Sequence, residues 1–184
     1  RQSLAVEIPF ASSVAKAVIS LDKGASAIQY ALEVDWHEAV RHEVGRRETP
    51  VPMLAFVAPS ATPVGEYQYD VPAGVQKRPP VHQDVPGLQY GAALLGDRAL
   101  AILTDCKYGY RGADDRIGLT LLHATNNPDP YPDRGIHKIR LAVAVSDPSP
   151  KALEEAAFDF AHLPGYVPAG AHAGTLPPTA SLLS

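Results

Sequence analysis

The sequence predicts an all-β protein, an antiparallel β-sandwich with one short helix near its C-terminal end. Apolar and polar residues alternate in several runs, turn-forming sequences separate these runs, and 18 of the 184 residues are proline. Alternation with period two is typical of strands with one buried face. Proline at about twice its usual share of roughly 5% disfavours a helical bundle. A hydrophobic content of 46% is enough for a sizeable core.

The alternating runs define the predicted strands in chain order. They are residues 4–10, 25–36, 67–71, 117–121 and 139–145, and a further apolar strand ends at residue 104. Turn signals separate them at residues 22–24, 60–63, 96–97 and 126–130. Because no helices alternate with these strands, we expect an antiparallel sandwich rather than a parallel sheet.

One helix is predicted after the last strand. Ser149 is a suitable N-cap, Pro150 suits the first helical position, and apolar residues then follow at helical spacing as far as Phe160. Pro164 and Gly165 end it. The Gly-, Pro- and Ala-rich residues 164–184 are predicted to be a loop-rich tail, and residues 1–184 to form a single domain.

Composition excludes several classes of function. Sixteen basic and twenty acidic residues give a net charge of −4 without a basic stripe, so nucleic acid is not expected as a partner. No run approaches the roughly 18 apolar residues of a membrane helix. The single cysteine indicates a reducing, cytoplasmic setting. The N-terminus lacks a methionine and a signal-peptide pattern, so we expect a piece of a longer protein.

Reactive side chains gather at the end of one strand, in the sequence LTDCKYGY at residues 103–110. A nucleophilic Cys106 would require a histidine base, which the sequence does not place nearby. The interpretation of Cys106 as a half-buried small hydrophobe is therefore favoured.

Two histidine-containing segments are candidate ligand sites. In HEAVRH, residues 37–42, the histidines are five apart, about 140° beyond a full helical turn, so they could not share one metal ion on a helix. The loop PDPYPDRGIH, residues 128–137, carries Asp129, Asp133 and His137. These side chains could bind a sugar hydroxyl or a cation. Asp and Pro are also ordinary turn formers, and the residue types favour a turn over a ligand site.

Several stretches together resemble a known family. They are VDWHE at 34–38, VPMLAF at 51–56, YDVPAGVQKRP at 69–79, TDCKYGY at 104–110 and the run from LLHATNN to AVAV at 121–145. In this order they resemble the C-terminal β region of the family 38 glycoside hydrolases, the α-mannosidases, and most of all its bacterial and cytosolic branch. The likeness covers nearly the whole chain and implies a supersandwich of the galactose-mutarotase type. His123 stands where the family often has arginine.

The resemblance implies a parent enzyme that hydrolyses terminal α-D-mannosidic bonds of oligosaccharides with retention. In the family, zinc and the aspartate nucleophile belong to an N-terminal α/β barrel, which a helical region follows. The barrel and the helical region are therefore the expected partners within the parent, which could also form a homo-oligomer. No catalytic or zinc-binding residue is expected in this chain, which alone should be inactive.

The resemblance also nominates residues on the substrate side. A β-domain loop of this family helps to shape the sugar site, and Lys107, Tyr108 and Asp105 are the candidates for that contact. A lysine can donate to sugar hydroxyls, and a tyrosine offers a stacking face and a hydroxyl. The alternative is that they pack against the barrel or close a turn. The alternative function is a stand-alone carbohydrate-binding or interaction sandwich, which the aromatic content of 7% disfavours.

Overall fold

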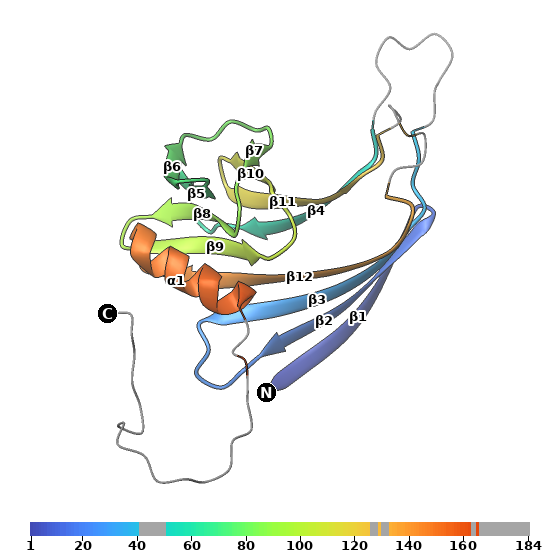
Figure 1. Cartoon of the computed structure of the whole chain (residues 1–184), viewed down its shortest axis with the longest axis horizontal. Coiled ribbons are helices and arrows are strands. Elements are labelled where there is room, and N and C mark those ends of the chain that lie inside the picture. The colour runs from blue at the N-terminus through green and yellow to red at the C-terminus, as the bar shows by residue number, and fades with distance from the viewer. Residues whose placement is uncertain (41–50, 126–128, 130–132, 163–164, 166–184) are drawn as a thin grey trace.

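The structure is a computed structural model that describes residues 1–40, 51–125, 129, 133–162 and 165. Strands make up most of the described chain, and one helix follows the last of them (Figure 1). The elements are β1 (Gln2–Phe10), β2 (Ser13–Leu21), β3 (Ala27–Trp36), β4 (Met53–Pro59), β5 (Tyr67–Val71), β6 (Gly74–Arg78), β7 (Val85–Pro86), β8 (Tyr90–Leu95), β9 (Arg98–Thr104), β10 (Gly109–Ala113), β11 (Arg116–His123), β12 (Gly135–Ser146) and α1 (Pro150–Ala161). The tail predicted at residues 164–184 lies, apart from Gly165, outside the described residues.

The strands form two stacked sheets. The larger has the order β1-β2-β3-β12-β9-β8-β5-β6 and the smaller the order β4-β11-β10-β7. Neighbouring strands are antiparallel throughout both sheets. This confirms the predicted antiparallel sandwich. No helix among the described residues is long and apolar enough to cross a membrane.

The alternating runs and the apolar run that ends at residue 104 predicted six of the strands, β1, β3, β5, β9, β11 and β12, but not β4 or β8. Local sequence also explains two of the turns. Gly24 (φ +79°) and Gly96 (φ +75°) adopt left-handed conformations that cost glycine little, at two of the predicted turns. The β2 strand was not predicted. Its sequence alternates weakly, because Val14 and Val18 lie on the face opposite the core while Ala15 and Ala17 lie on the core side. The short strands β6, β7 and β10 also lack a clear alternation.

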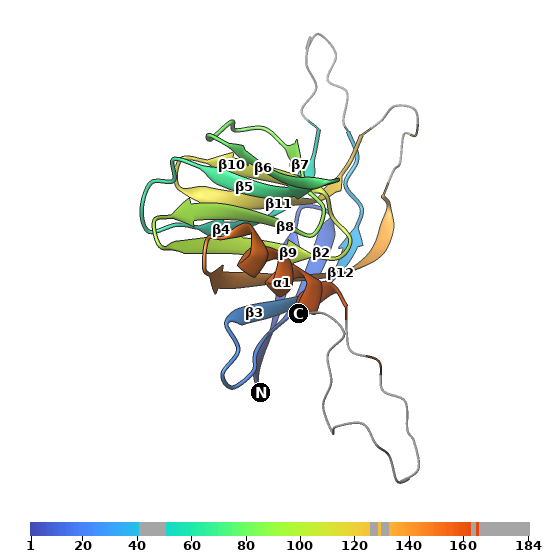
Figure 2. The ribbon, with the colours of Figure 1, turned by 60° about the vertical axis from the view of Figure 1, so that its left-hand side comes forward.

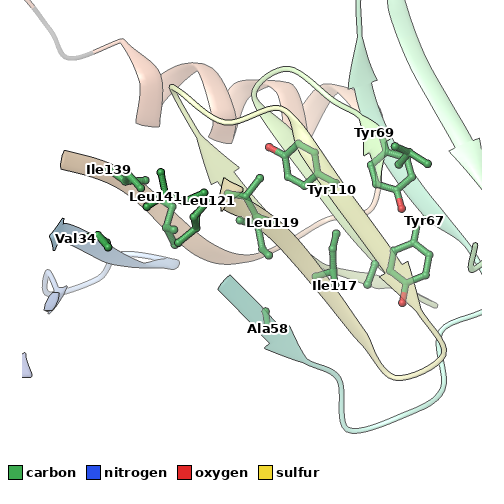
Figure 3. Close-up of a cluster of buried hydrophobic side chains, with 14 of the residues drawn as sticks. Val34, Ala58, Tyr67, Tyr69, Tyr110, Ile117, Leu119, Leu121, Ile139 and Leu141 are labelled. Atoms are coloured by element: carbon green, nitrogen blue, oxygen red, sulfur yellow. The ribbon is translucent and has the colours of Figure 1, made fainter. Parts of the chain in front are cut away.

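The core lies between the two sheets and is built around tyrosine rings (Figure 3). Tyr110 of β10 is fully buried, and a Cβ atom added to Gly87 or to Gly91 would lie within 3 Å of its ring. These two glycines therefore leave the space that the ring fills. Tyr67 occupies similar space beside Gly112, and its hydroxyl donates to the carbonyls of Ala113 and Arg116. Burial is the main cause that raises the pKa of Tyr67 to about 12.

Helix α1 covers the other face of the larger sheet. It packs on β8, β9 and β12 (Figure 2). Its buried residues Leu153 and Ala157 meet a sheet face made largely of alanines, which lets the helix approach closely. The predicted helix from Pro150 to Phe160 is thus confirmed, with its end at Ala161.

Replacing Ser149 with alanine is expected to lower the free energy of unfolding by about 1 kcal/mol. The Ser149 hydroxyl caps α1 by accepting a hydrogen bond from the Ala152 backbone N–H, at 3.4 Å. Urea denaturation would measure the loss, and Ser149→Asp, which retains a capping oxygen, is the matched control. Equal midpoints for the alanine and aspartate variants would contradict the assigned cap.

Candidate functional site

The segment that the sequence singled out connects the two sheets. After β9 ends at Thr104, residues 105–108 cross to β10 of the smaller sheet. Hydrogen bonds hold both ends: the Thr104 N–H donates to the Gln89 carbonyl at 2.9 Å, and the Gly87 N–H donates to the Tyr108 carbonyl at 3.0 Å. The crossing is therefore anchored to the segment that joins β7 and β8.

Asp105 is held by an arginine of the neighbouring strand. The Arg140 Nη1 atom lies 3.6 Å from Asp105 Oδ2. The same guanidinium donates to the Phe160 carbonyl at 2.9 Å and lies 5.1 Å from the centre of the Phe160 ring. Arg140 thus joins the crossing to the last turn of α1, and we interpret Asp105 as a group that positions this loop.

A hollow of about 480 Å³ opens beside the crossing. The residues that line it come from four separate parts of the chain: Asp70, Leu88, Gln89, Thr104, Asp105, Tyr108, Ala161 and His162. Tyr108 is 59% exposed, so a ligand could reach its ring and its hydroxyl. The half-exposed Lys107 follows Asp105 in the same loop but does not line the hollow. Carboxylate, amide, hydroxyl and aromatic groups together match the chemistry of a sugar.

Asp105 and Tyr108, two of the three substrate-side candidates, line this hollow, and the sequence did not point to the lining residues that come from elsewhere. Gln89 and His162 are 73 positions apart in the numbering, and no local pattern links them. The one available signal was the stretch at 69–79, which contains Asp70 and contributed to the family resemblance.

Cys106 is half-buried and its surroundings disfavour the thiolate. Burial is the main cause that raises the pKa of its thiol, and a hydrogen bond with Asp105 adds to the effect. The favoured interpretation of Cys106 as a small hydrophobe agrees with its packing against the core. A nucleophilic role would require a lowered pKa instead.

Alkylation of Cys106 by iodoacetamide at neutral pH is therefore expected to be severalfold slower in the folded chain than in denaturant. A raised thiol pKa leaves less thiolate at neutral pH, and the rate should climb as pH rises toward that pKa. Mass spectrometry of the labelled chain over time measures the rate, and Cys106→Ser reports any labelling elsewhere. A folded chain that reacts as fast as the denatured one would contradict this result.

The other predicted loop contributed Asp129, Asp133 and His137 as candidates. Asp133 adopts a positive φ of +58°, and its carbonyl lies 2.5 Å from the His137 Nε2 atom. On β12, Leu141 lies opposite Thr104, the residue just before the crossing. His137 comes four positions before Leu141, which places it roughly 13 Å away along the strand. Asp129 is exposed, in a segment whose neighbouring residues lie outside the described chain. Asp133 and His137 therefore lie apart from the crossing.

The described residues do not bring together a metal site. They contain no group of three or more His, Cys, Asp or Glu side chains that could hold a metal ion. The His37 Nε2 atom lies 2.8 Å from an Asp35 carboxylate oxygen, and its companion in HEAVRH, His42, lies outside the described residues.

A second polar cluster, which the sequence did not suggest, lies on the outer face of the smaller sheet. Asp84 accepts hydrogen bonds from the Arg111 guanidinium at 2.9 Å and from the Thr120 hydroxyl at 2.7 Å. Arg111 and Thr120 also border a groove of about 570 Å³, whose lining includes the small or apolar residues Val57 and Gly118. The cluster links β10 and β11 to the segment before β7, and its own hydrogen bonds occupy both carboxylate oxygens of Asp84.

Comparison with known proteins identifies the family. The sequence-family model described as "Glycosyl hydrolases family 38 C-terminal domain" matches residues 1–131. Alpha-mannosidase G of Dictyostelium discoideum is 26% identical over 144 residues, which cover 74% of this chain and 12% of that protein. The crystal structure of a glycosyl hydrolase family 38 protein from Enterococcus faecalis shares the fold, with a TM-score of 0.62 and 12% identity.

That structural match covers 81% of this chain and 18% of the Enterococcus chain. The chain thus spans only a small part of the length of both relatives. The family model nevertheless covers most of it, in agreement with the resemblance seen in the sequence motifs. The chain is therefore a member of the C-terminal domain family of the family 38 glycosyl hydrolases.

Proposed function

We propose that this domain is part of an α-mannosidase that hydrolyses terminal α-D-mannosidic bonds of oligosaccharides with retention. The observation that carries the proposal is the family match over residues 1–131. A relative that is named an α-mannosidase supports the substrate class. The proposal includes a role in mannose metabolism and a reducing, cytoplasmic setting, with which the single half-buried Cys106 agrees.

The proposed contribution of this domain is one side of the sugar site. The crossing at residues 105–108 is anchored at both ends and ends in an exposed aromatic ring at Tyr108. Lys107 would donate to sugar hydroxyls, and Tyr108 would offer its ring face or its hydroxyl. Asp105, held by Arg140, would fix the position of both. The catalytic barrel and the helical region of the parent would form the remaining walls.

The chemistry itself is assigned to residues outside this domain. Retaining hydrolysis requires two carboxyl groups about 5–5.5 Å apart on either side of the scissile bond, and we propose that the catalytic barrel supplies them. Zinc does not fit the described residues, because they lack a group of three potential ligands. We propose that zinc, which would hold sugar hydroxyls, belongs to the catalytic barrel of the parent, as the family resemblance implies.

The full-length protein is expected to hydrolyse an aryl α-mannoside. Activity should be lost with a chelator and return when zinc is added, and NMR should detect α-mannose as the first product, as retention requires. Aryl β-mannoside is the matched control substrate and should remain intact. First release of β-mannose would contradict retention, and inactivity on α-mannosides with turnover of another glycoside would contradict the proposed substrate.

The stand-alone alternative predicts a different result. A carbohydrate-binding module should bind mannosidic oligosaccharides by itself with micromolar affinity, as calorimetric titration of the 184-residue chain would show. We expect no binding of that strength, because Tyr108 is the one Phe, Tyr or Trp residue among those that line the hollow beside the crossing.

A further inference from the structure

The hollow beside the crossing is lined by polar groups that the proposed function does not use. Its volume of about 480 Å³ lies within the range of about 300–1,000 Å³ that is typical of small-molecule sites. Strand β5 contributes Asp70, the segment before β8 contributes Gln89, and the end of α1 contributes His162. Lys107, which the proposed function places against the sugar that is cleaved, does not line the hollow. The crossing therefore offers two separate surfaces to a ligand.

Gln89 combines a fixed backbone with a free side chain. Its N–H donates to Asp70 Oδ2 at 3.2 Å, and its carbonyl accepts from the Thr104 N–H at 2.9 Å. Within the described chain its carboxamide has no hydrogen-bond partner, and neither has the Tyr108 hydroxyl. A carboxamide both donates and accepts, as does a hydroxyl. The hollow thus presents unused donors and acceptors at positions that the backbone holds.

Two rings from different elements also line the hollow. The exposed Tyr108 ring belongs to the crossing, and the His162 imidazole follows α1. The imidazole stacks on the Phe158 ring, with 4.2 Å between ring centroids and 21° between ring planes. Its Nδ1 atom lies 3.1 Å from the Phe158 carbonyl oxygen, and an Nδ1–H that donates to this oxygen leaves Nε2 as an acceptor. The rings offer apolar faces beside the polar groups, a combination that suits a sugar.

Arg140 connects the two elements that carry these rings. Its guanidinium lies 3.6 Å from Asp105 Oδ2 in the crossing and donates to the Phe160 carbonyl of α1 at 2.9 Å. The walls of the hollow are therefore held together before any ligand arrives. Order of this kind lowers the entropy cost of binding.

The residue types of the hollow disfavour other classes of ligand. The described residues that line it include no lysine or arginine, so it offers no positive side chain to a phosphate or a nucleotide. Asp70, Asp105 and His162 all line it, but no such group among the described residues could hold a metal ion. An uncharged ligand with several hydroxyls, each of which donates and accepts, matches these groups best.

We propose that the hollow binds the sugar unit next to the mannosyl unit that is cleaved, and that Gln89 and His162 set a preference for oligosaccharides over small glycosides. The inference rests on the proposed function, because it assigns a place to the second sugar unit of a mannosidic substrate. The cleaved unit contacts Lys107, and the neighbouring unit contacts the hollow. Residues 105–108 border both contacts, which suits two sugar units joined by one glycosidic bond.

Kinetics of the full-length protein with two substrates test the inference. Gln89→Ala and His162→Ala should each lower kcat/KM for an α-linked mannobiose by about 3- to 10-fold relative to an aryl α-mannoside, as the loss of a neutral hydrogen bond predicts. Gln83→Ala is the matched control, because Gln83 is exposed and does not line the hollow. It should leave both values unchanged.

The outcomes separate this inference from the proposed function. If either variant hydrolysed both substrates with the wild-type ratio of kcat/KM values, the second-sugar site would be wrong while the α-mannosidase activity stood. If the wild-type protein hydrolysed neither substrate, the proposed function would be wrong and the inference would fall with it.

Binding of ligands that are not cleaved provides a second test, which does not depend on turnover. The wild-type full-length protein should bind a sulfur-linked α-mannobiose about 3- to 10-fold more tightly than methyl α-thiomannoside in calorimetric titrations. Gln89→Ala should remove most of this difference, with thermal unfolding as the check that the variant is folded. Equal Kd values for the two ligands in the wild-type protein would overturn the proposal, as would a difference that persists in the folded variant.

Discussion

Gly91→Ala is expected to destabilise the domain by about 1–3 kcal/mol, the usual cost of overpacking a core. The added Cβ atom would lie 2.5 Å from Cδ1 of Tyr110 and 2.9 Å from its Cγ. The ring cannot move away, because Gly87 approaches its other side so closely that a Cβ there would be 2.7 Å from Cδ2. Urea denaturation of the chain would show a lower midpoint with an unchanged slope.

Two further variants make this expectation specific. Gly65→Ala is the matched control, because a Cβ at Gly65 would meet no atom within 4 Å, and it should be nearly neutral. In a Tyr110→Leu background the added cost of Gly91→Ala should shrink, since the ring that causes the clash is gone. If Gly91→Ala cost no more than Gly65→Ala, the close packing of the two sheets around Tyr110 would be wrong.

Lys107→Ala is expected to lower kcat/KM of the full-length protein for an aryl α-mannoside by about 10- to 100-fold. This corresponds to the loss of one hydrogen bond that involves a charged group, about 1.5–3 kcal/mol. The melting temperature should stay the same, because the Lys107 side chain is half-exposed at the surface of the crossing. Steady-state kinetics and thermal unfolding of the same preparations separate the two effects.

The control for Lys107 is another surface lysine. Lys77 of β6 lies 3.2 Å from a carboxylate oxygen of Glu66, and Lys77→Ala removes a positive charge without touching the crossing. It should leave kcat/KM unchanged. Unchanged kinetics in Lys107→Ala would remove Lys107 from the sugar site while leaving family membership intact.

The structure changes how the residues of LTDCKYGY are understood. Tyr110, the second aromatic of this stretch, serves the core rather than a ligand, because two glycines from other elements enclose its ring. Tyr108, two positions earlier, is exposed beside the hollow. Strand alternation would place two residues that are two positions apart on the same face. They differ because Tyr110 belongs to β10 whereas Tyr108 belongs to the crossing before it, a boundary that the sequence alone did not reveal.

The predicted strands and helix were largely correct where local rules apply. The run at residues 25–36 alternates over its whole length and forms β3 over Ala27–Trp36, and Ser149 with Pro150 begins α1 as capping chemistry requires. Prediction failed where alternation is weak, as in β2. It could not foresee that the apolar side of β1 would be left uncovered, since coverage depends on a second layer rather than on the strand itself.

The sequence by itself determined the strand periodicity, the helix cap, the positions of two turns and the family, because each depends on neighbours in the chain or on motifs in order. Tertiary structure alone decided which distant residues meet. Strand β12 lies between β3 and β9, and this brings Arg140 to Asp105 and the end of α1 to the hollow beside the crossing. Such contacts arise from the order of strands in the sheet. The periodicity of the sequence specifies the face on which a residue lies, but it does not specify the residue's partner on a neighbouring strand.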